Sequence, residues 1–250
     1  MIHSFLLIGQ SNMAGRGFAH EVERIQNKDV LVLRNGRWLP MYVPVNPDRS
    51  FAGINLAESF ADKYAREKQV QVGLIPCADG GTCLDQWVEG SLLFDHACYM
   101  ARLASRTSTI AGVLWHQGES DCLEHRYPFY ETKCAAIMEA FRRELDLYDV
   151  PFLLGGLGDY LMDCERSPVY QNYRYINEAL RQIDGKQRRM GYVSAEGLTA
   201  NADNLHFNAA SLREFGLRYY EEFLKLEDKY KVFEEKSTPD QAIRNEIELL

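Results

Sequence analysis

The sequence predicts an α/β fold, a three-layer α/β/α sandwich built around a five-stranded parallel sheet. Short apolar runs without polar alternation recur along the chain, and amphipathic helical patterns separate them. The chain has 250 residues, of which 46% are hydrophobic, so it can bury one large core. Strands that alternate with helices indicate βαβ crossovers and therefore a parallel sheet.

The expected strands are five apolar runs bounded by Gly, Pro or polar residues: Ser4–Ile8, Val70–Pro76, Ile110–Trp115, Pro151–Leu154 and Met190–Ser194. The expected helices lie between and after them, over Asn55–Lys68, Leu92–Ser105, Tyr127–Leu147, Pro168–Ile183 and Ala209–Tyr230. An Asn35-Gly36 turn within Asp29–Pro40 predicts a tight hairpin, which we expect to lie outside the sheet.

The end of the chain shows a separate helical pattern. We expect residues 1–236 to form one domain, because Ser237 and its neighbours interrupt the charge pattern there. Thr238, Pro239 and Gln241 are typical of a helix start, which predicts a C-terminal helix over 237–250. We expect this helix to dock on its own domain; a contact between two copies, and so a homo-oligomer, is the alternative.

Charge and composition narrow the range of partners. The formal net charge is -8 with acidic residues spread along the chain, which predicts no nucleic-acid or membrane partner. No apolar run is long enough to span a membrane, and Ile2–Ile8 is too short for a signal peptide and lacks a basic leader, so we expect a cytoplasmic protein. The cysteines form no CxxC pair, which predicts reduced, mostly buried thiols at Cys77, Cys83, Cys98, Cys122, Cys134 and Cys164.

Polar residues interrupt the chain where the expected strands end, which is where open parallel sheets bind ligands. Ser11 follows the first strand, and Asp203-Asn204-Leu205-His206 follows the fifth. A serine hydroxyl becomes a nucleophile when a histidine takes its proton and a carboxylate orients that histidine. Each residue alone fits a cap or a turn, but together they indicate a Ser-His-Asp site.

Two further segments end strands on the same side. Acyl transfer needs hydrogen-bond donors for the developing oxyanion, and the backbone N–H of Gly81 and the side chain of Gln117 suit that role. A metal-dependent hydrolase built on His116, Glu119 and Asp121 is an alternative, but these residues lack a recognised zinc spacing. We therefore expect no metal and no cofactor.

Four separated blocks together resemble one superfamily. The blocks are LIGQSNMAGRG from Leu7, DGGTCLDQW from Asp79, WHQGESD from Trp115 and DNLHFN from Asp203. They resemble the SGNH hydrolases, and more closely the sialate O-acetylesterase and carbohydrate esterase family 6 (acetylxylan esterase-like) branch. The resemblance implies a flavodoxin-like sandwich with strand order 2-1-3-4-5 over residues 1–236. It also implies a serine esterase that removes acetyl groups from carbohydrates without a metal.

The resemblance also implies residue roles. Ser11 is implied as the nucleophile, His206 as the general base and acid, and Asp203 as its orienting carboxylate. The Ser11 and Gly81 backbone N–H groups and the Gln117 side chain are implied as the oxyanion hole. Supporting roles fall to three more residues. Asn12 and Arg16 brace the nucleophile loop or contact substrate, and Glu119 bonds within its loop, supports Gln117 or replaces Asp203.

The sequence does not name the sugar. A cationic side chain would favour binding of the sialic acid carboxylate, and Arg16, Arg126 and Arg166 are candidates for it. A neutral acetylated sugar such as xylan needs no such contact. Trp87 is either a sugar-stacking residue or part of the core. A catalytically silent carbohydrate-binding protein and an acyltransferase on the same scaffold are the alternatives to an esterase.

Overall fold

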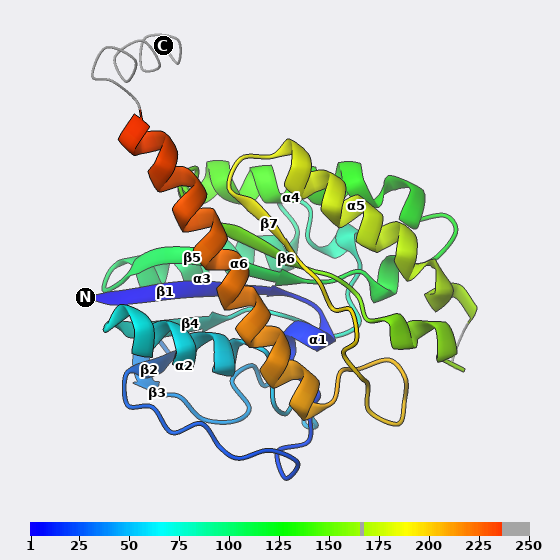
Figure 1. Cartoon of the computed structure of the whole chain (residues 1–250), viewed down its shortest axis with the longest axis horizontal. Helices are drawn as coiled ribbons and strands as arrows, with labels where there is room; N and C mark the ends of the chain where they lie inside the picture. Colours follow the sequence, from blue (N-terminus) through cyan, green and yellow to red (C-terminus); the bar gives the residue numbers. More distant parts are fainter. Residues whose placement is uncertain (166–167, 237–250) are drawn as a thin grey trace.

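The computed structural model describes residues 1–165 and 168–236, with side chains through Lys229 (Figure 1). One seven-stranded sheet runs through it, with strand order β3-β2-β4-β1-β5-β6-β7. Arg166 and the helix predicted over 237–250 lie outside the described residues.

Five parallel strands form the predicted part of the sheet, and β1 lies at its centre. They are β1 (Ile2–Gly9), β4 (Gln71–Pro76), β5 (Thr109–His116), β6 (Phe152–Gly155) and β7 (Met190–Val193). Every neighbouring pair among them is parallel, so their carboxyl ends meet at one edge of the sheet. Their order is the 2-1-3-4-5 order that the sequence resemblance implies.

The predicted hairpin exists, but its expected place outside the sheet is wrong. Its strands β2 (Val30–Arg34) and β3 (Arg37–Pro40) extend the sheet, with β2 parallel to β4 and β3 antiparallel to β2. Val30, Val32 and Leu33 are buried there. The hairpin thus pairs the open edge of β4 and hides its own apolar side chains, which a position outside the sheet would leave in water.

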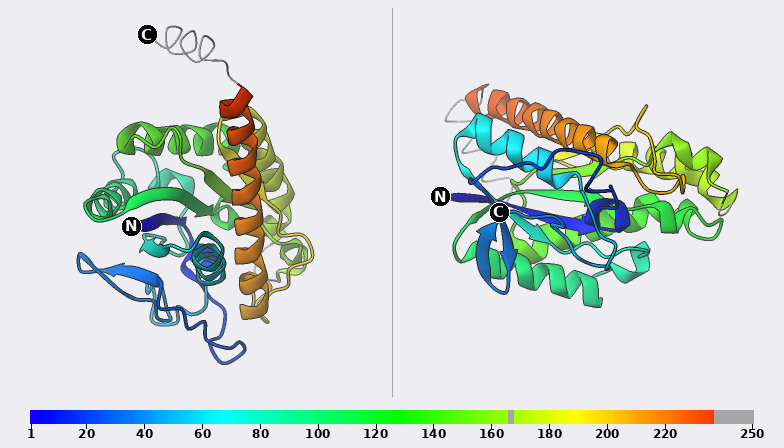
Figure 2. Two further views of the ribbon diagram at one scale, coloured as in Figure 1. Left: turned by 60° about the vertical axis from the view of Figure 1, so that its left-hand side comes forward. Right: turned by 90° about the horizontal axis from the view of Figure 1, so that it is seen from below.

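Helices cover both faces of the sheet (Figure 2). On one face lie α2 (Ala57–Lys68) and α6 (Ala209–Lys236), and on the other α3 (Leu92–Ser105), α4 (Tyr130–Leu145) and α5 (Tyr173–Lys186). Side chains of β1 alternate between the two cores: Phe5 and Leu7 pack with α2 and α6, and Leu6 and Ile8 with the opposite layer. This is the three-layer sandwich that the sequence predicts.

Short helical turns occupy the carboxyl edge of the sheet. The four-residue helix α1 (Ser11–Ala14) follows β1 directly. The 3-10 turns of the described residues span Leu84–Gln86, Glu119–Asp121, Tyr127–Phe129, Asp159–Asp163 and Pro168–Asn172. The predicted helices over Tyr127–Leu147 and Pro168–Ile183 thus each begin with a 3-10 turn before α4 and α5.

All six cysteines are free and buried, which confirms the expectation of unpaired thiols. Within the described part of the chain, no helix is both long enough and apolar enough to cross a membrane.

Candidate active site

The turn after β1 places Ser11 at the carboxyl edge of the sheet. Gly9 has a φ of 126°, and a Cβ atom built on it would lie 2.1 Å from the carbonyl oxygen of His116 in the neighbouring strand. Glycine is therefore required for β1 to lie this close to β5 as the chain turns. The Gln10 N–H then donates to the same His116 carbonyl at 2.8 Å, which fixes the start of α1.

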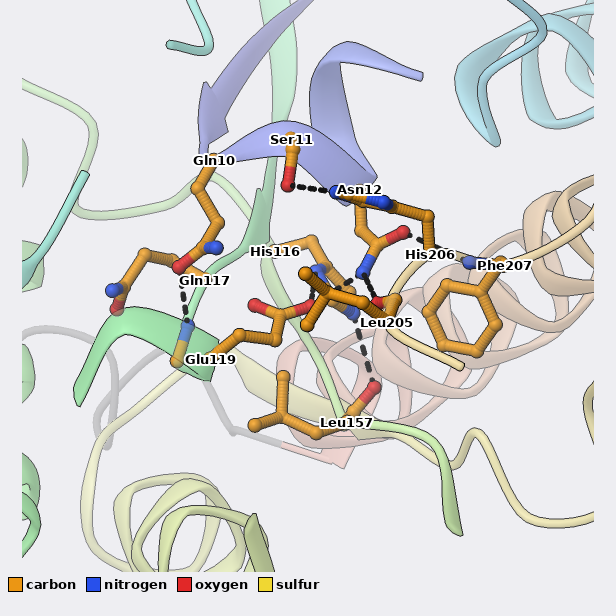
Figure 3. Close-up of polar contacts among 12 residues, drawn as sticks. Gln10, Ser11, Asn12, His116, Gln117, Glu119, Leu157, Leu205, His206 and Phe207 are labelled. Atoms are coloured by element: carbon orange, nitrogen blue, oxygen red, sulfur yellow. Dashed lines mark hydrogen bonds and ion pairs between the residues drawn. The ribbon is translucent and has the colours of Figure 1, made fainter. Parts of the chain in front are cut away.

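Ser11 lies at the end of a chain of hydrogen-bonded side chains. Its Oγ is 3.0 Å from Nε2 of His206, and Nδ1 of His206 is 2.7 Å from Oδ2 of Asp203. These three residues come from the two ends of the sequence, and Figure 3 shows Ser11 facing His206. The structure thus brings together the three residues that the sequence predicts as nucleophile, base and orienting acid.

The Asp203 turn is held by its own carboxylate. Oδ1 of Asp203 accepts the backbone N–H groups of Leu205 and His206, each at 3.0 Å, and Asn204 adopts the left-handed conformation with a φ of 47°. Burial works to raise the pKa of Asp203, but the hydrogen bonds from the His206 side chain and these backbone groups lower it below the usual value. Asp203 is therefore ionised at neutral pH and can stabilise a protonated His206.

Asn12 ties the serine turn to the histidine loop (Figure 3). Its Oδ1 accepts the Phe207 N–H at 3.1 Å, and its Nδ2 donates to the Leu205 carbonyl at 3.3 Å. Nδ2 also donates to Oε1 of Glu119 at 2.5 Å. The fully buried Asn12 thus holds the backbone on both sides of His206, and Glu119 anchors it from the loop after β5.

Glu119 does not contact His206 among the interactions of the described residues. Besides the bond to Asn12, Oε1 of Glu119 lies 3.9 Å from Nδ1 of the buried His116. Nε2 of His116 lies 3.1 Å from the carbonyl oxygen of Gly156, and burial lowers the pKa of His116 although the Glu119 charge opposes this. Of the open alternatives for Glu119, hydrogen bonding within the loops is the one that the geometry favours.

The side-chain amide of Gln117, which the sequence predicts as an oxyanion-hole donor, is engaged by other residues. Its side chain is fully buried, and its Nε2 donates to the Thr82 carbonyl at 3.1 Å and to Oδ2 of Asp121 at 2.5 Å. The buried carboxylate of Asp121 is a stronger acceptor than a neutral carbonyl, which explains why it holds the amide. The backbone N–H groups of Ser11 and Gly81 have no acceptor among the described residues.

Arg16 fastens a second loop to the serine turn. Its guanidinium binds both carboxylate oxygens of Asp48, at 3.0 and 2.7 Å, and the Gly15 carbonyl at 2.8 Å. Asp48 in turn accepts the Gly80 N–H at 2.9 Å, and a Cβ atom on Gly80 would lie 3.4 Å from Cβ of Ser11. The predicted bracing position of Arg16 thus depends on Asp48, which the sequence reasoning missed because no motif marks it.

Sequence reasoning also missed Gln10, although it stands beside Ser11 in the first block. Its Oε1 accepts the N–H groups of Gly118 and Ser120, at 3.2 and 3.4 Å, and so holds the loop after β5. Trp87 lies fully buried, and its Nε1 donates to Oγ1 of Thr82 at 3.0 Å. Trp87 therefore belongs to the core and is not available to stack on a sugar.

A pocket of about 460 Å³ opens beside Asp203 and His206. Its other lining residues are Arg16, Phe18, Phe51, Asn201 and Ala202. Arg126 does not line it; its guanidinium donates to the Ser120 carbonyl at 2.9 Å.

The three residues that the sequence offers as alternative metal ligands each form a hydrogen bond with a different residue. The side chains of His116, Glu119 and Asp121 bond to Gly156, Asn12 and Gln117 respectively. Within residues 1–165 and 168–236, no group of three or more His, Cys, Asp or Glu side chains is arranged to hold a metal ion.

Comparison with known proteins gives consistent matches. Residues 1–225 match the family described as carbohydrate esterase, sialic acid-specific acetylesterase. The Arabidopsis thaliana protein named probable carbohydrate esterase At4g34215 is 28% identical over 88% of this chain and 89% of its own length. Its crystal structure superposes with a TM-score of 0.77, covering 89% of this chain and 98% of that one.

Two further solved structures share the fold. The structure of NanS has a TM-score of 0.75 at 17% identity, covering 91% of this chain and 98% of that one. A carbohydrate acetylesterase from Xanthomonas citri has a TM-score of 0.64 at 18% identity, covering 87% of this chain and 55% of that one. The second of these chains is much longer than the part that matches.

Proposed function

Because this chain is a carboxylic ester hydrolase that belongs to the family of sialic acid-specific acetylesterases, we propose that it removes O-acetyl groups from a carbohydrate through an acetyl-enzyme on Ser11. In this proposal residues 1–236 are the esterase domain and no metal takes part. One observation carries it, namely the hydrogen-bonded series from Oγ of Ser11 through His206 to Asp203.

The geometry supports each proton transfer. As Oγ of Ser11 attacks the acetyl carbonyl, its proton moves to Nε2 of His206 across the 3.0 Å contact. The Nδ1–H of His206 donates to Asp203, whose negative charge stabilises the imidazolium. His206 then gives the proton to the departing sugar oxygen. Water, deprotonated by His206, releases acetate from Ser11 in the second half of the reaction.

The oxyanion of the tetrahedral intermediate needs donors that are not already used. In our proposal these are the backbone N–H groups of Ser11 and Gly81, neither of which has an acceptor among the described residues. Gln117 is left out of this role, because its amide is engaged by Thr82 and Asp121.

The test is hydrolysis of chromogenic acetyl, butyryl and octanoyl esters by the wild type, by Ser11→Ala and by the control Ser105→Ala. Ser105 is exposed at the end of α3 and does not line the pocket beside Asp203 and His206. We expect turnover selective for the acetyl ester, a fall in kcat of about 10⁴-fold or more in Ser11→Ala, and no change in the control. A folded Ser11→Ala variant that keeps its turnover would refute the mechanism.

A further inference from the structure

The proposed oxyanion donor Gly81 depends on its neighbours for its orientation. Gly81 lies exposed in the loop after β4, and no described atom beyond its chain neighbours lies within 4 Å of a Cβ atom built on it. Its N–H can stabilise the oxyanion only if it points to the place where that charge develops. The groups that hold this loop therefore bear on the chemistry, and several of them come from residues 46–49, between β3 and α2.

Asp48 joins this loop to the serine turn through one buried carboxylate. Its Oδ2 accepts the Gly80 N–H at 2.9 Å and Nη2 of Arg16 at 2.7 Å, and its Oδ1 accepts Nη1 of Arg16 at 3.0 Å. The Arg16 and Asp48 side chains are only 6% and 4% exposed, so water does not compete for these bonds. Gly80 in turn lies against the nucleophile, since a Cβ atom built on it would be 3.4 Å from Cβ of Ser11. Asp48 thus sets how the loop lies relative to Ser11.

Arg49 holds the same loop from its other side. Its Nη1 donates to Oδ1 of Asp79 at 2.7 Å, and its Nη2 donates to the Gly80 carbonyl at 2.9 Å. The Gly80 carbonyl and the Gly81 N–H belong to one planar trans peptide unit, in which they point in opposite directions. By fixing the carbonyl, Arg49 therefore also fixes the direction of the Gly81 N–H.

The chain after Gly81 is held as well. Oγ1 of Thr82 donates to the Asp79 carbonyl at 2.7 Å and accepts the Trp87 Nε1–H at 3.0 Å. The Thr82 carbonyl accepts the Gln117 amide at 3.1 Å. Gly81 thus stands between two held residues, and what orients its N–H is the hold on the peptide unit before it.

We propose that Asp48 and Arg49 are positioning residues of this esterase, which hold the peptide unit between Gly80 and Gly81 so that its N–H meets the oxyanion. The inference rests on the proposed function and extends its machinery to a loop outside the catalytic series. Neither residue lines the pocket beside Asp203. Loss of either hold should therefore weaken binding of the transition state and lower kcat, while binding of the substrate is retained.

The first variant is Asp48→Asn, with Glu58→Gln as its matched control. An asparagine has one acceptor oxygen, so it cannot serve both guanidinium nitrogens of Arg16 and the Gly80 N–H without turning an N–H donor toward one of them. The buried Glu58 likewise pairs with an arginine, Arg213, and accepts a backbone N–H. We expect both variants to lose stability, but only Asp48→Asn to lose kcat for ethyl acetate, by about 10- to 100-fold with KM within about twofold of wild type.

The second variant, Arg49→Ala, keeps the test independent of a buried charge, because the Arg49 side chain is 42% exposed. Its control is Arg102→Ala, since Arg102 also binds a carboxylate and a backbone carbonyl, both of Glu144, at the surface. We expect kcat to fall about three- to tenfold in Arg49→Ala with KM unchanged, and neither value to change in Arg102→Ala.

A second readout reports on the oxyanion itself. With 1,1,1-trifluoroacetone, Oγ of Ser11 adds to the ketone carbon, the carbonyl electron pair moves onto its oxygen, and the proton passes to His206. The product is an anionic hemiketal that resembles the tetrahedral intermediate. We expect Ki for this ketone to rise in Asp48→Asn and Arg49→Ala by about the factor by which kcat/KM falls, and to stay unchanged in both controls.

The outcomes separate this inference from the esterase proposal. Unchanged kcat and Ki in Arg49→Ala would overturn the role of Arg49, and the same result in Asp48→Asn that of Asp48, with the esterase left intact. A rise in KM at unchanged kcat would overturn positioning in favour of substrate contact, and an equal loss of kcat in Glu58→Gln would assign the effect to the fold. Ethyl acetate turnover that survives in Ser11→Ala would instead overturn the mechanism itself.

Discussion

Two pairs of a histidine and an acid lie at the same edge of the sheet, each three residues apart in sequence. In one pair, Asp203 and His206 are 2.7 Å apart and border a solvent pocket. In the other, His116 and Glu119 are 3.9 Å apart and buried, and Nδ1 of His116 and Oε2 of Glu119 have no hydrogen-bond partner among the described residues. Both pairs thus join a histidine to an acid at the same spacing, with opposite chain order, and they differ in geometry.

The backbone explains the difference. Asn204 takes the left-handed conformation, which lets Oδ1 of Asp203 accept two backbone N–H groups while Oδ2 faces His206. Between His116 and Glu119 the chain instead passes Gly118 at a φ of 154°, and Glu119 turns to Asn12. In our proposal the Asp203–His206 pair accepts the proton of Ser11, whereas Glu119 holds Asn12 from the loop after β5.

Matched substitutions in both pairs test whether only Asp203 and His206 serve ester hydrolysis. We expect kcat for acetyl ester hydrolysis to fall about 10⁴-fold in His206→Gln and about 10³- to 10⁴-fold in Asp203→Asn. We expect His116→Gln and Glu119→Gln to stay within about tenfold of wild type, because glutamine keeps a donor or acceptor at each buried position. An inactive Glu119→Gln alongside an active Asp203→Asn would move the acid role to the buried pair.

A smaller effect is expected at the residue that connects the two pairs. Asn12→Ala removes the hydrogen bonds to Leu205, Phe207 and Glu119, so His206 loses its fixed position relative to Ser11. We expect kcat to fall about 10²-fold with KM for ethyl acetate nearly unchanged, since Asn12 positions a proton acceptor and does not line the pocket. A rise in KM with kcat unchanged would indicate substrate contact instead of positioning.

The smallest expected effect is on the free energy of unfolding, and it comes from His116 in the buried pair. Burial lowers the pKa of His116 below its usual 6.5. Just below that pH, the unfolded chain therefore binds a proton at His116 that the folded chain does not bind. The contribution of neutral His116 to stability is therefore complete above pH 6.5 and declines as the pH falls below it, by at most about 1.4 kcal/mol per pH unit. Urea unfolding at pH 7, 6 and 5 should show a shallower pH dependence in His116→Gln, and equal slopes would contradict the assignment.

The parallel core and its strand order could be predicted from sequence, because buried strands carry continuous apolar runs and crossovers need helices between them. The hairpin could not be placed, since an apolar strand such as Val30–Arg34 satisfies the same pattern inside or outside a sheet. Its position follows from the open edge of β4, which is a property of the assembled sheet.

In the candidate site, too, the sequence predicts some contacts and not others. The Asp203 to His206 contact could be predicted because it forms within one short turn. The orientation of Gln117 could not, because it depends on Thr82 and Asp121, whose positions the local sequence does not determine. The segments at Gly17 and Ile54 are likewise joined by backbone hydrogen bonds between loops that no motif marks.

The Asn12 contacts to Leu205 and Phe207 join positions 193 and 195 residues apart in the chain. During synthesis from the amino terminus, Ser11 is made 195 residues before His206 and has no His206 beside it until then. A nascent chain or a fragment that ends before residue 206 would therefore carry an unreactive serine hydroxyl. Reactivity would arise only with completion of the fold, so an unfinished copy could not hydrolyse esters.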